Sequence, residues 1–98
     1  MDVLQSVLSE SRKHYSGLKK KIEKDLKVLP SGSVKKRRIN GAVYYYLQER
    51  VGDKVVHRYL GKVRPEELME QVEKRRALKA ELKKVNENLR IVQRAVGR

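Results

Sequence analysis

The sequence contains no cysteine, no phenylalanine and no tryptophan, and it has only two prolines in 98 residues. The lack of cysteine excludes disulfide bonds and thiolate zinc sites, and it leaves the redox compartment open. The chain also lacks the roughly 18 consecutive apolar residues of a membrane span, and its second residue, Asp2, is acidic where a signal peptide would be basic. We therefore expect a cytoplasmic protein that does not insert into a membrane.

Acidic residues are scarce relative to basic ones. The chain has 25 Lys and Arg against 12 Asp and Glu, which gives a formal net charge of +13. Such an imbalance attracts polyanions and speeds encounter with them, and nucleic acid is the commonest such partner. A chain of this length forms one domain at most. We predict a single domain over residues 1–98, with a thin core that long helices or a second copy of the chain must complete.

Two long helices are predicted, over residues 1–29 and 65–96. Apolar or helix-compatible side chains recur there at alternating steps of four and three, as in the heptad repeat of a coiled coil. Asp2 suits the N-cap of the first helix, and Pro65 suits the first turn of the second. The first seam consists of Leu4, Leu8, Ser11, Tyr15, Leu18, Ile22, Asp25 and Leu29. The second seam consists of Leu68, Gln71, Arg75, Leu78, Leu82, Val85, Leu89, Val92 and Val96.

The two seams have similar lengths, about 40 to 48 Å at the rise of an α-helix, which favours an antiparallel coiled-coil hairpin. Extra apolar residues widen the stripes at Val3 and Val7 in the first helix and at Ile91 and Ala95 in the second. Antiparallel pairing brings these four residues to the same end. We predict that a second protomer covers that end in a four-helix arrangement, which makes the protein a homodimer. The alternative is a monomer whose helix ends stay exposed.

A three-stranded sheet is predicted over residues 33–62. Asn40-Gly41 is a strong signal for a two-residue type I′ hairpin, and Gly52-Asp53 fits the type II′ hairpin with glycine first. The strands are expected at about 34–39, 42–51 and 54–60, in an antiparallel meander with the tyrosine-rich strand in the centre. The expected fold class is therefore α+β, in the order α-β-β-β-α, with the two helices flanking the sheet.

Two-residue turns also fix the register, so the two faces of the sheet can be assigned from the sequence. The more apolar face, expected to pack on the helices, carries Val34, Val43, Tyr45, Leu47, Val51, Val56 and Leu60, interrupted by the charged residues Lys36, Arg38, Glu49, Lys54 and Arg58. The opposite face, expected to meet solvent, carries Lys35, Arg37, Ile39, Tyr44, Tyr46, Gln48, Arg50, Val55, His57 and Tyr59. The tyrosine run 44–46 is thereby divided between the two faces.

The solvent face suits nucleic acid, because aromatic rings stack on unpaired bases while Lys and Arg hold phosphates. Residues 30–64 hold nine basic and two acidic residues, so the positive charge is concentrated on the sheet. The tyrosines suit a purely structural role about as well, since cross-strand Tyr pairs stabilise sheets. The candidate nucleic-acid-binding residues are Lys35, Lys36, Arg37, Arg38, Tyr44, Tyr46, Arg50, His57 and Tyr59.

Catalytic signals are weak. The two histidines, His14 and His57, lie on different elements and have no acid or nucleophile at a motif spacing. Ser16 to Lys19 forms an S-x-x-K string without the companion motifs that give it meaning. We therefore expect a non-enzymatic protein that has no metal and no cofactor. The alternative to nucleic-acid binding is an adaptor, or a neutralising partner of an acidic protein, that acts through its coiled coil. The sequence leaves open DNA or RNA, and single or double strands.

From about Leu29 to Val96 the chain resembles a family of small bacterial and archaeal proteins of uncharacterised function. The resemblance rests on "GS" at 32–33, "YYYL" at 44–47, "GDKVVHRYLGK" at 52–62 and "EKRR" at 73–76. It implies a helix, sheet, helix layout. Many relatives carry a cysteine-containing insertion like a metal knuckle where this chain has Asn40-Gly41, so no metal role is carried over. The order of three strands and a helix is also similar to the DNA-binding modules of phage-type integrases, an analogy of fold only.

Overall fold

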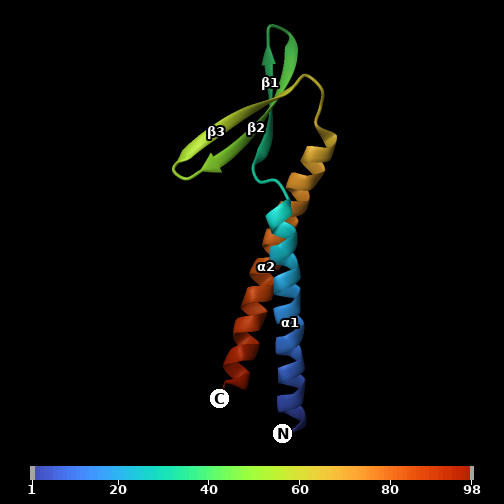
Figure 1. Cartoon of the computed structure of the whole chain (residues 1–98), viewed down its shortest axis with the longest axis vertical. Helices are drawn as coiled ribbons and strands as arrows, with labels where there is room; N and C mark the ends of the chain where they lie inside the picture. The colour runs from blue at the N-terminus through green and yellow to red at the C-terminus, as the bar shows by residue number, and fades with distance from the viewer. Residues whose placement is uncertain (1, 98) are drawn as a thin grey trace. The chain divides into compact units, whose positions relative to one another are not determined.

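The computed structural model describes residues 2–97 and shows an α+β chain in the order expected from the sequence (Figure 1). Helix α1 comes first and helix α2 last, and three strands lie between them. Each observed boundary lies within one or two residues of the predicted one. The elements are α1 (Val3–Val28), β1 (Ser33–Ile39), β2 (Ala42–Val51), β3 (Lys54–Gly61) and α2 (Glu66–Val96).

The chain divides into two compact units. One contains α1 and the part of α2 from Arg76 onward, and the other runs from Leu29 to Arg75 and contains the whole sheet. Helix α1 begins where the sequence predicts, because an Asp2 side-chain oxygen accepts a hydrogen bond of 2.7 Å from the Gln5 backbone N–H. This bond satisfies one of the amide groups that a helix start leaves without a partner.

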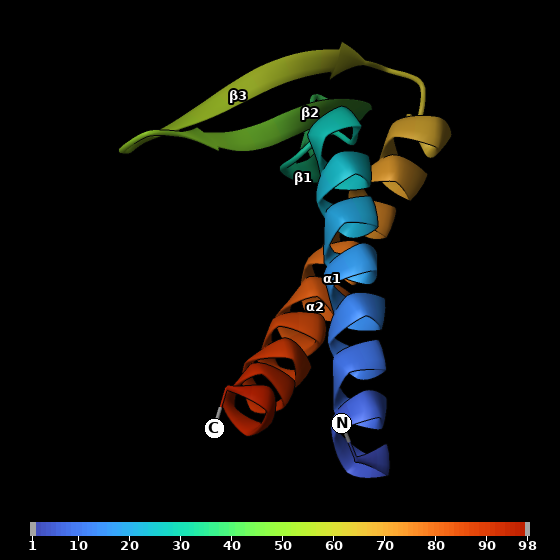
Figure 2. The same ribbon diagram turned by 60° about the horizontal axis from the view of Figure 1, so that its bottom comes forward.

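The sheet is an antiparallel meander in the order β1-β2-β3, with the tyrosine-rich β2 in the centre (Figure 2). Both predicted turns are confirmed. Asn40 and Gly41 have φ values of 52° and 83°, as a type I′ turn requires, and Gly52 has a φ of 64° at the first position of its turn. The β1–β2 register matches the prediction along its whole length, with Lys35 opposite Tyr46.

The buried side chains of the helices come from the predicted seams, except at Val72 in α2. In the unit formed by α1 and the end of α2, Ile22, Val85 and Leu89 are buried. In α2 the sequence placed Gln71 on the seam, which is wrong, because Gln71 is exposed and Val72 is buried instead. The heptad pattern predicted that the next buried residue after Leu68 would come three positions later, at Gln71. It comes four positions later, at Val72, and residues at either spacing lie on the same side of a helix.

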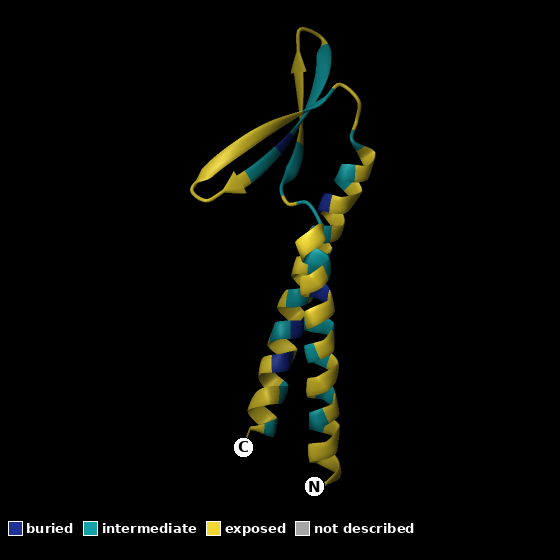
Figure 3. Ribbon diagram, viewed as in Figure 1, coloured by how far each residue is buried: buried dark blue, intermediate teal, exposed yellow. Residues whose placement is uncertain are grey.

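The face of the sheet that was predicted to be apolar is covered over only part of its length. Leu47 is buried, and Val34, Val43 and Tyr45 are partly buried (Figure 3). Val51 and Val56, which were expected in the core, are 59% and 43% exposed. The prediction was wrong for these two valines. They lie near the β2–β3 turn, where the side chains of this face stay accessible to solvent. Below, the face that carries Leu47 is called the leucine face.

Within residues 2–97, no helix is both long enough and apolar enough to cross a membrane. The longest helix, α2, has 31 residues, but charged side chains recur along it.

Candidate functional site

The candidate site lies on the face of the sheet opposite Leu47, which we call the tyrosine face. All three strands contribute to it, because β1 and β3 both pair with the central strand β2. The register sets Lys35 opposite Tyr46, Arg37 opposite Tyr44 and Tyr46 opposite Tyr59. Since alternate residues of a strand share a face, the tyrosine face consists of Lys35, Arg37, Ile39, Tyr44, Tyr46, Gln48, Arg50, Val55, His57 and Tyr59.

Three tyrosine rings form a cluster on this face. The Tyr59 ring lies 5.5 Å from the Tyr46 ring and 6.2 Å from the Tyr44 ring, centroid to centroid. The rings are tilted by 56° and 49°, so they meet obliquely and do not stack in parallel. Aromatic pairs in this range of distance and angle are attractive, and each contributes about 0.5 to 1.5 kcal/mol to stability. Tyr59 is therefore the central member of the cluster.

A cation lies over a ring at each end of the cluster. The guanidinium carbon of Arg37 is 5.3 Å from the centre of the Tyr46 ring. The ammonium nitrogen of Lys62 is 5.6 Å from the centre of the Tyr44 ring. Both distances are within the range of a cation–π interaction, which places positive charge directly beside the aromatic surface. The site thus combines three rings with two flanking cations.

Lys62 is the member of the site that sequence reasoning missed, and a β-bulge explains why. The predicted β2–β3 register holds from the turn up to Tyr46, but beyond it Tyr45 pairs with Gly61 and not with Leu60. The extra residue shifts the register by one, so the next position, Lys62, comes beside Tyr44. Gly61 has a φ of 121°, which other residues rarely adopt, and a glycine at this place is compatible with a bulge, although the sequence alone does not show where the register shifts.

No carboxylate belongs to the tyrosine face, all of whose residues lie within the described part of the chain. The two acidic residues of the segment 30–64 are Glu49, which belongs to the leucine face, and Asp53, which lies in the β2–β3 turn. Glu49 pairs there with Arg58 at 3.9 Å. The cations of the tyrosine face therefore keep their attraction for an external anion, because no acidic neighbour on that face neutralises them.

The other predicted site residues are spread more widely. Arg50 lies opposite Val55, four residues along β2 from Tyr46, or about 13 Å at the rise of a strand. His57 lies opposite Gln48, between Arg50 and the cluster. Lys36 and Arg38 lie opposite Tyr45 and Val43 and so belong to the leucine face. The geometric cluster is thus smaller than the predicted set, and β1 presents cations to both faces.

Gly61 offers a test of how the bulge is built. Replacing it with alanine adds a Cβ that meets nothing within 4 Å, so any cost comes from the backbone conformation at a φ of 121°. We expect Gly61→Ala to lower the free energy of unfolding by about 1 to 3 kcal/mol. Urea denaturation measures this change. The matched control is Gly17→Ala, also in open space but in the interior of α1, which should stabilise the protein by about 1 kcal/mol. Equal stability of Gly61→Ala and wild type would contradict the strained bulge.

Metal-ligating groups do not gather in the described part of the chain. Within residues 2–97, no three His, Asp or Glu side chains are placed to hold a metal ion. His14 contacts the ring of its neighbour Tyr15, with 5.4 Å between the centroids, and it is remote in sequence from His57. The groups that the tyrosine face presents, phenol rings and cationic side chains, are capable of ring contact, cationic attraction and hydrogen bonding.

Comparison with known protein families identifies the family of this chain. The model of a family described as a domain of unknown function (DUF6788) matches residues 8–70, more than half of the chain. The matched stretch contains most of α1, the complete sheet with the tyrosine face and the start of α2. No curated protein and no solved structure matches the chain significantly.

Proposed function

We propose that this chain, which belongs to the DUF6788 family of unknown function, is a non-enzymatic nucleic-acid-binding protein that uses its tyrosine face. The observation that carries the proposal is the cluster of Tyr44, Tyr46 and Tyr59 with Arg37 and Lys62 over its outer rings. Rings and cations in direct contact, on a face without carboxylates, match the two parts of a nucleotide, its base and its phosphate.

Binding would take place in two stages. The net charge of +13 attracts the phosphate backbone over a distance set by the salt concentration. Lys35, Arg37 and Arg50, all exposed on the tyrosine face, then replace condensed counterions at the phosphates, and the release of those ions favours binding. Contact of bases with the tyrosine rings, or contact of the sheet with a groove, completes the complex.

We also propose that α1 and α2 pair as an antiparallel coiled coil and that two chains associate through its end. The support comes from apolar side chains next to the two seams, which are exposed to solvent in a single chain. Val3, Val7 and Ile91 are 81%, 53% and 65% exposed, and Ala95, four residues after Ile91 on α2, is exposed as well. Apolar side chains gathered at one end are a surface that association removes from water.

The dimer proposal gives a prediction for sedimentation. Val7→Glu combined with Ile91→Glu places four like charges in the proposed interface of a dimer, so we expect the double variant to sediment as a monomer while wild type sediments as a dimer. The control is Val63→Glu, which adds an acid at an apolar residue that is 82% exposed in the sheet-containing unit. A wild-type chain that stays monomeric at high concentration would contradict the dimer.

A second function is favoured by the same exposed helix ends. An adaptor or neutralising partner of an acidic protein would dock its partner on the apolar ends of α1 and α2 and use the positive charge for attraction. A pulldown of the tagged chain from native lysate, with and without nuclease, distinguishes the two functions. Release of the bound material by nuclease supports nucleic-acid binding, whereas a stoichiometric protein that remains after nuclease supports the adaptor.

A further inference from the structure

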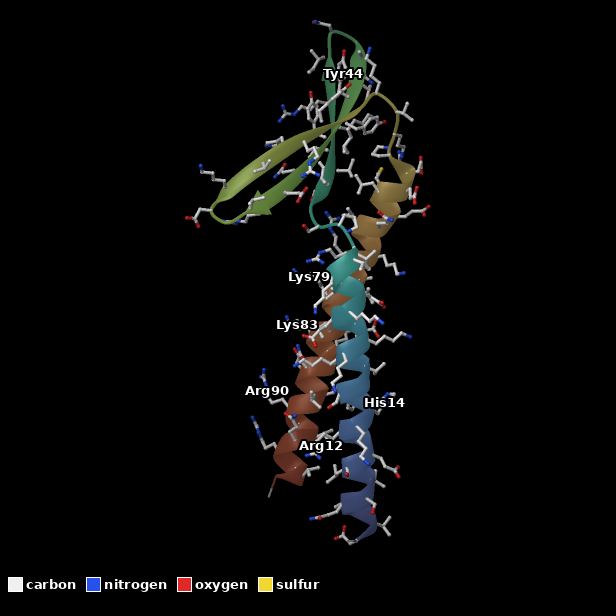
Figure 4. The ribbon with its side chains drawn as sticks, viewed as in Figure 1. Arg12, His14, Tyr44, Lys79, Lys83 and Arg90 are labelled. Carbon is white, nitrogen blue, oxygen red and sulfur yellow. The ribbon has the colours of Figure 1, made fainter. Side chains whose placement is uncertain are left out.

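The tyrosine face contains an open depression. It has a volume of about 340 Å³ and is lined by Ile39, Tyr44, Tyr46 and Tyr59. Tyr44 projects from β2 close to the β1–β2 turn (Figure 4). The lining is aliphatic and aromatic, and its polar groups are the phenolic hydroxyls. Pockets of this composition favour flat, weakly polar ligands over strongly hydrated ones.

The ring arrangement leaves aromatic surface open to a ligand. Because Tyr59 meets its two neighbours at 56° and 49°, neither contact covers its ring as a parallel stack would. Tyr59 is 55% exposed, and no cation of residues 2–97 lies over its ring, whereas Tyr46 and Tyr44 each carry one. The Tyr59 ring is therefore the most accessible stacking surface, and it lies between two rings that bound the depression.

The two cations approach the cluster from opposite sides of the central strand β2. Arg37 is on β1 over Tyr46, and Lys62 follows β3 over Tyr44, so positive charge flanks the depression on both sides. A ligand that places a flat ring in the depression and an anionic group at each side would satisfy all of these contacts. A nucleotide within a strand has this form, because the sugar that carries each base is joined to one phosphate at its 5′ oxygen and to another at its 3′ oxygen.

We propose that the depression binds an unpaired nucleobase on Tyr59, with the adjacent phosphates held by Arg37 and Lys62. The preferred ligand is then single-stranded nucleic acid. This inference rests on the proposed function and goes beyond it by naming the strand form. In a duplex both faces of each base are covered by its neighbours, so only edges and phosphates are presented. A duplex would therefore contact the cations through its phosphates but would offer no base face for the tyrosine rings to stack on.

The test uses the natural fluorescence of the protein. Because the chain has no tryptophan and only five tyrosines, ring contact with a base changes tyrosine emission directly. Four probes of about 12 units are titrated at about 0.15 M salt: oligo-dT, oligo-rU, a mixed-sequence DNA duplex and inorganic polyphosphate. We expect both single strands to quench the emission and to bind at least about fivefold more tightly than duplex or polyphosphate, since one stacked base is worth about five- to 150-fold.

Variants separate the possible outcomes. Tyr59→Ala should remove most of the preference for single strands, and Tyr59→Phe should keep it, because the phenyl ring still stacks. Equal binding of duplex and single strand, without quenching, would overturn this inference while leaving nucleic-acid binding intact. Binding of polyphosphate as tightly as of the single strands would overturn both, because charge alone would then explain the affinity. Different affinities for oligo-dT and oligo-rU with quenching by both would support the inference and identify the preferred sugar.

Discussion

Replacing Tyr44, Tyr46 and Tyr59 together with alanine is expected to weaken single-strand binding by about 30-fold or more. The estimate takes two stacked bases at the lower bound of roughly 1 kcal/mol each. The rings stand on β2 and β3 and project from the tyrosine face, so their removal leaves the heptad seams of α1 and α2 intact. Helical circular dichroism should therefore be unchanged, and fluorescence anisotropy with a labelled single strand measures the affinity.

Two controls make this result specific to the rings. The triple replacement with phenylalanine keeps the aromatic surface and should keep the affinity within a few-fold of wild type. Tyr45→Phe alters the same strand on the leucine face, opposite Gly61 and Lys36, and should not change binding. A folded triple-alanine variant with unchanged affinity would exclude stacking and leave the rings a structural role in the sheet.

Replacing Lys35, Arg37 and Lys62 with glutamine should change how binding depends on salt. Each phosphate contact with a single strand contributes about 0.7 to the slope of log K against log salt, so three lost contacts lower the slope by about 2. Affinity at low salt should fall steeply as well. The slope is measured from anisotropy titrations at several salt concentrations, and it separates phosphate contacts from ring contacts, which change affinity with little effect on the slope.

The matched control removes the same charge from a helix. Lys79, Lys83 and Arg90 are exposed on α2 and project from the same side of it (Figure 4). Their replacement with glutamine lowers the net charge by the same three units but leaves the tyrosine face unchanged. We expect a much smaller change of slope for this variant. Equal slopes for the two triple variants would show that the positive charge acts as a whole and that the tyrosine face is not a binding site.

The sheet was predictable from the sequence largely because of its turns. Asn40-Gly41 and Gly52-Asp53 are both typical of two-residue hairpins, and a two-residue turn fixes the pairing of the residues that follow for as long as the two strands stay regular. The assignment of Tyr44, Tyr46 and Tyr59 to one face follows from that pairing alone. The contacts among the three rings are then a consequence of register, since cross-strand neighbours lie within reach of one another.

The sequence did not reveal the contribution of Lys62, because a bulge depends on the backbone of one residue. The sequence around Gly61 does not show where the register shifts. A shift of one residue moves Lys62 from the leucine face to the tyrosine face. The exposure of Val51 and Val56 also depended on tertiary structure. Alternation identifies the apolar face of a strand, but how far that face is covered depends on the elements around it.

The measurement that tests the central proposal most directly is fluorescence anisotropy of the wild-type protein with matched single- and double-stranded DNA and RNA over a range of salt concentrations. We predict binding that persists near physiological salt, with a preference for single strands. Binding to every probe that disappears at about 0.15 M salt would contradict the proposal, because the +13 charge would then account for the attraction without a defined site.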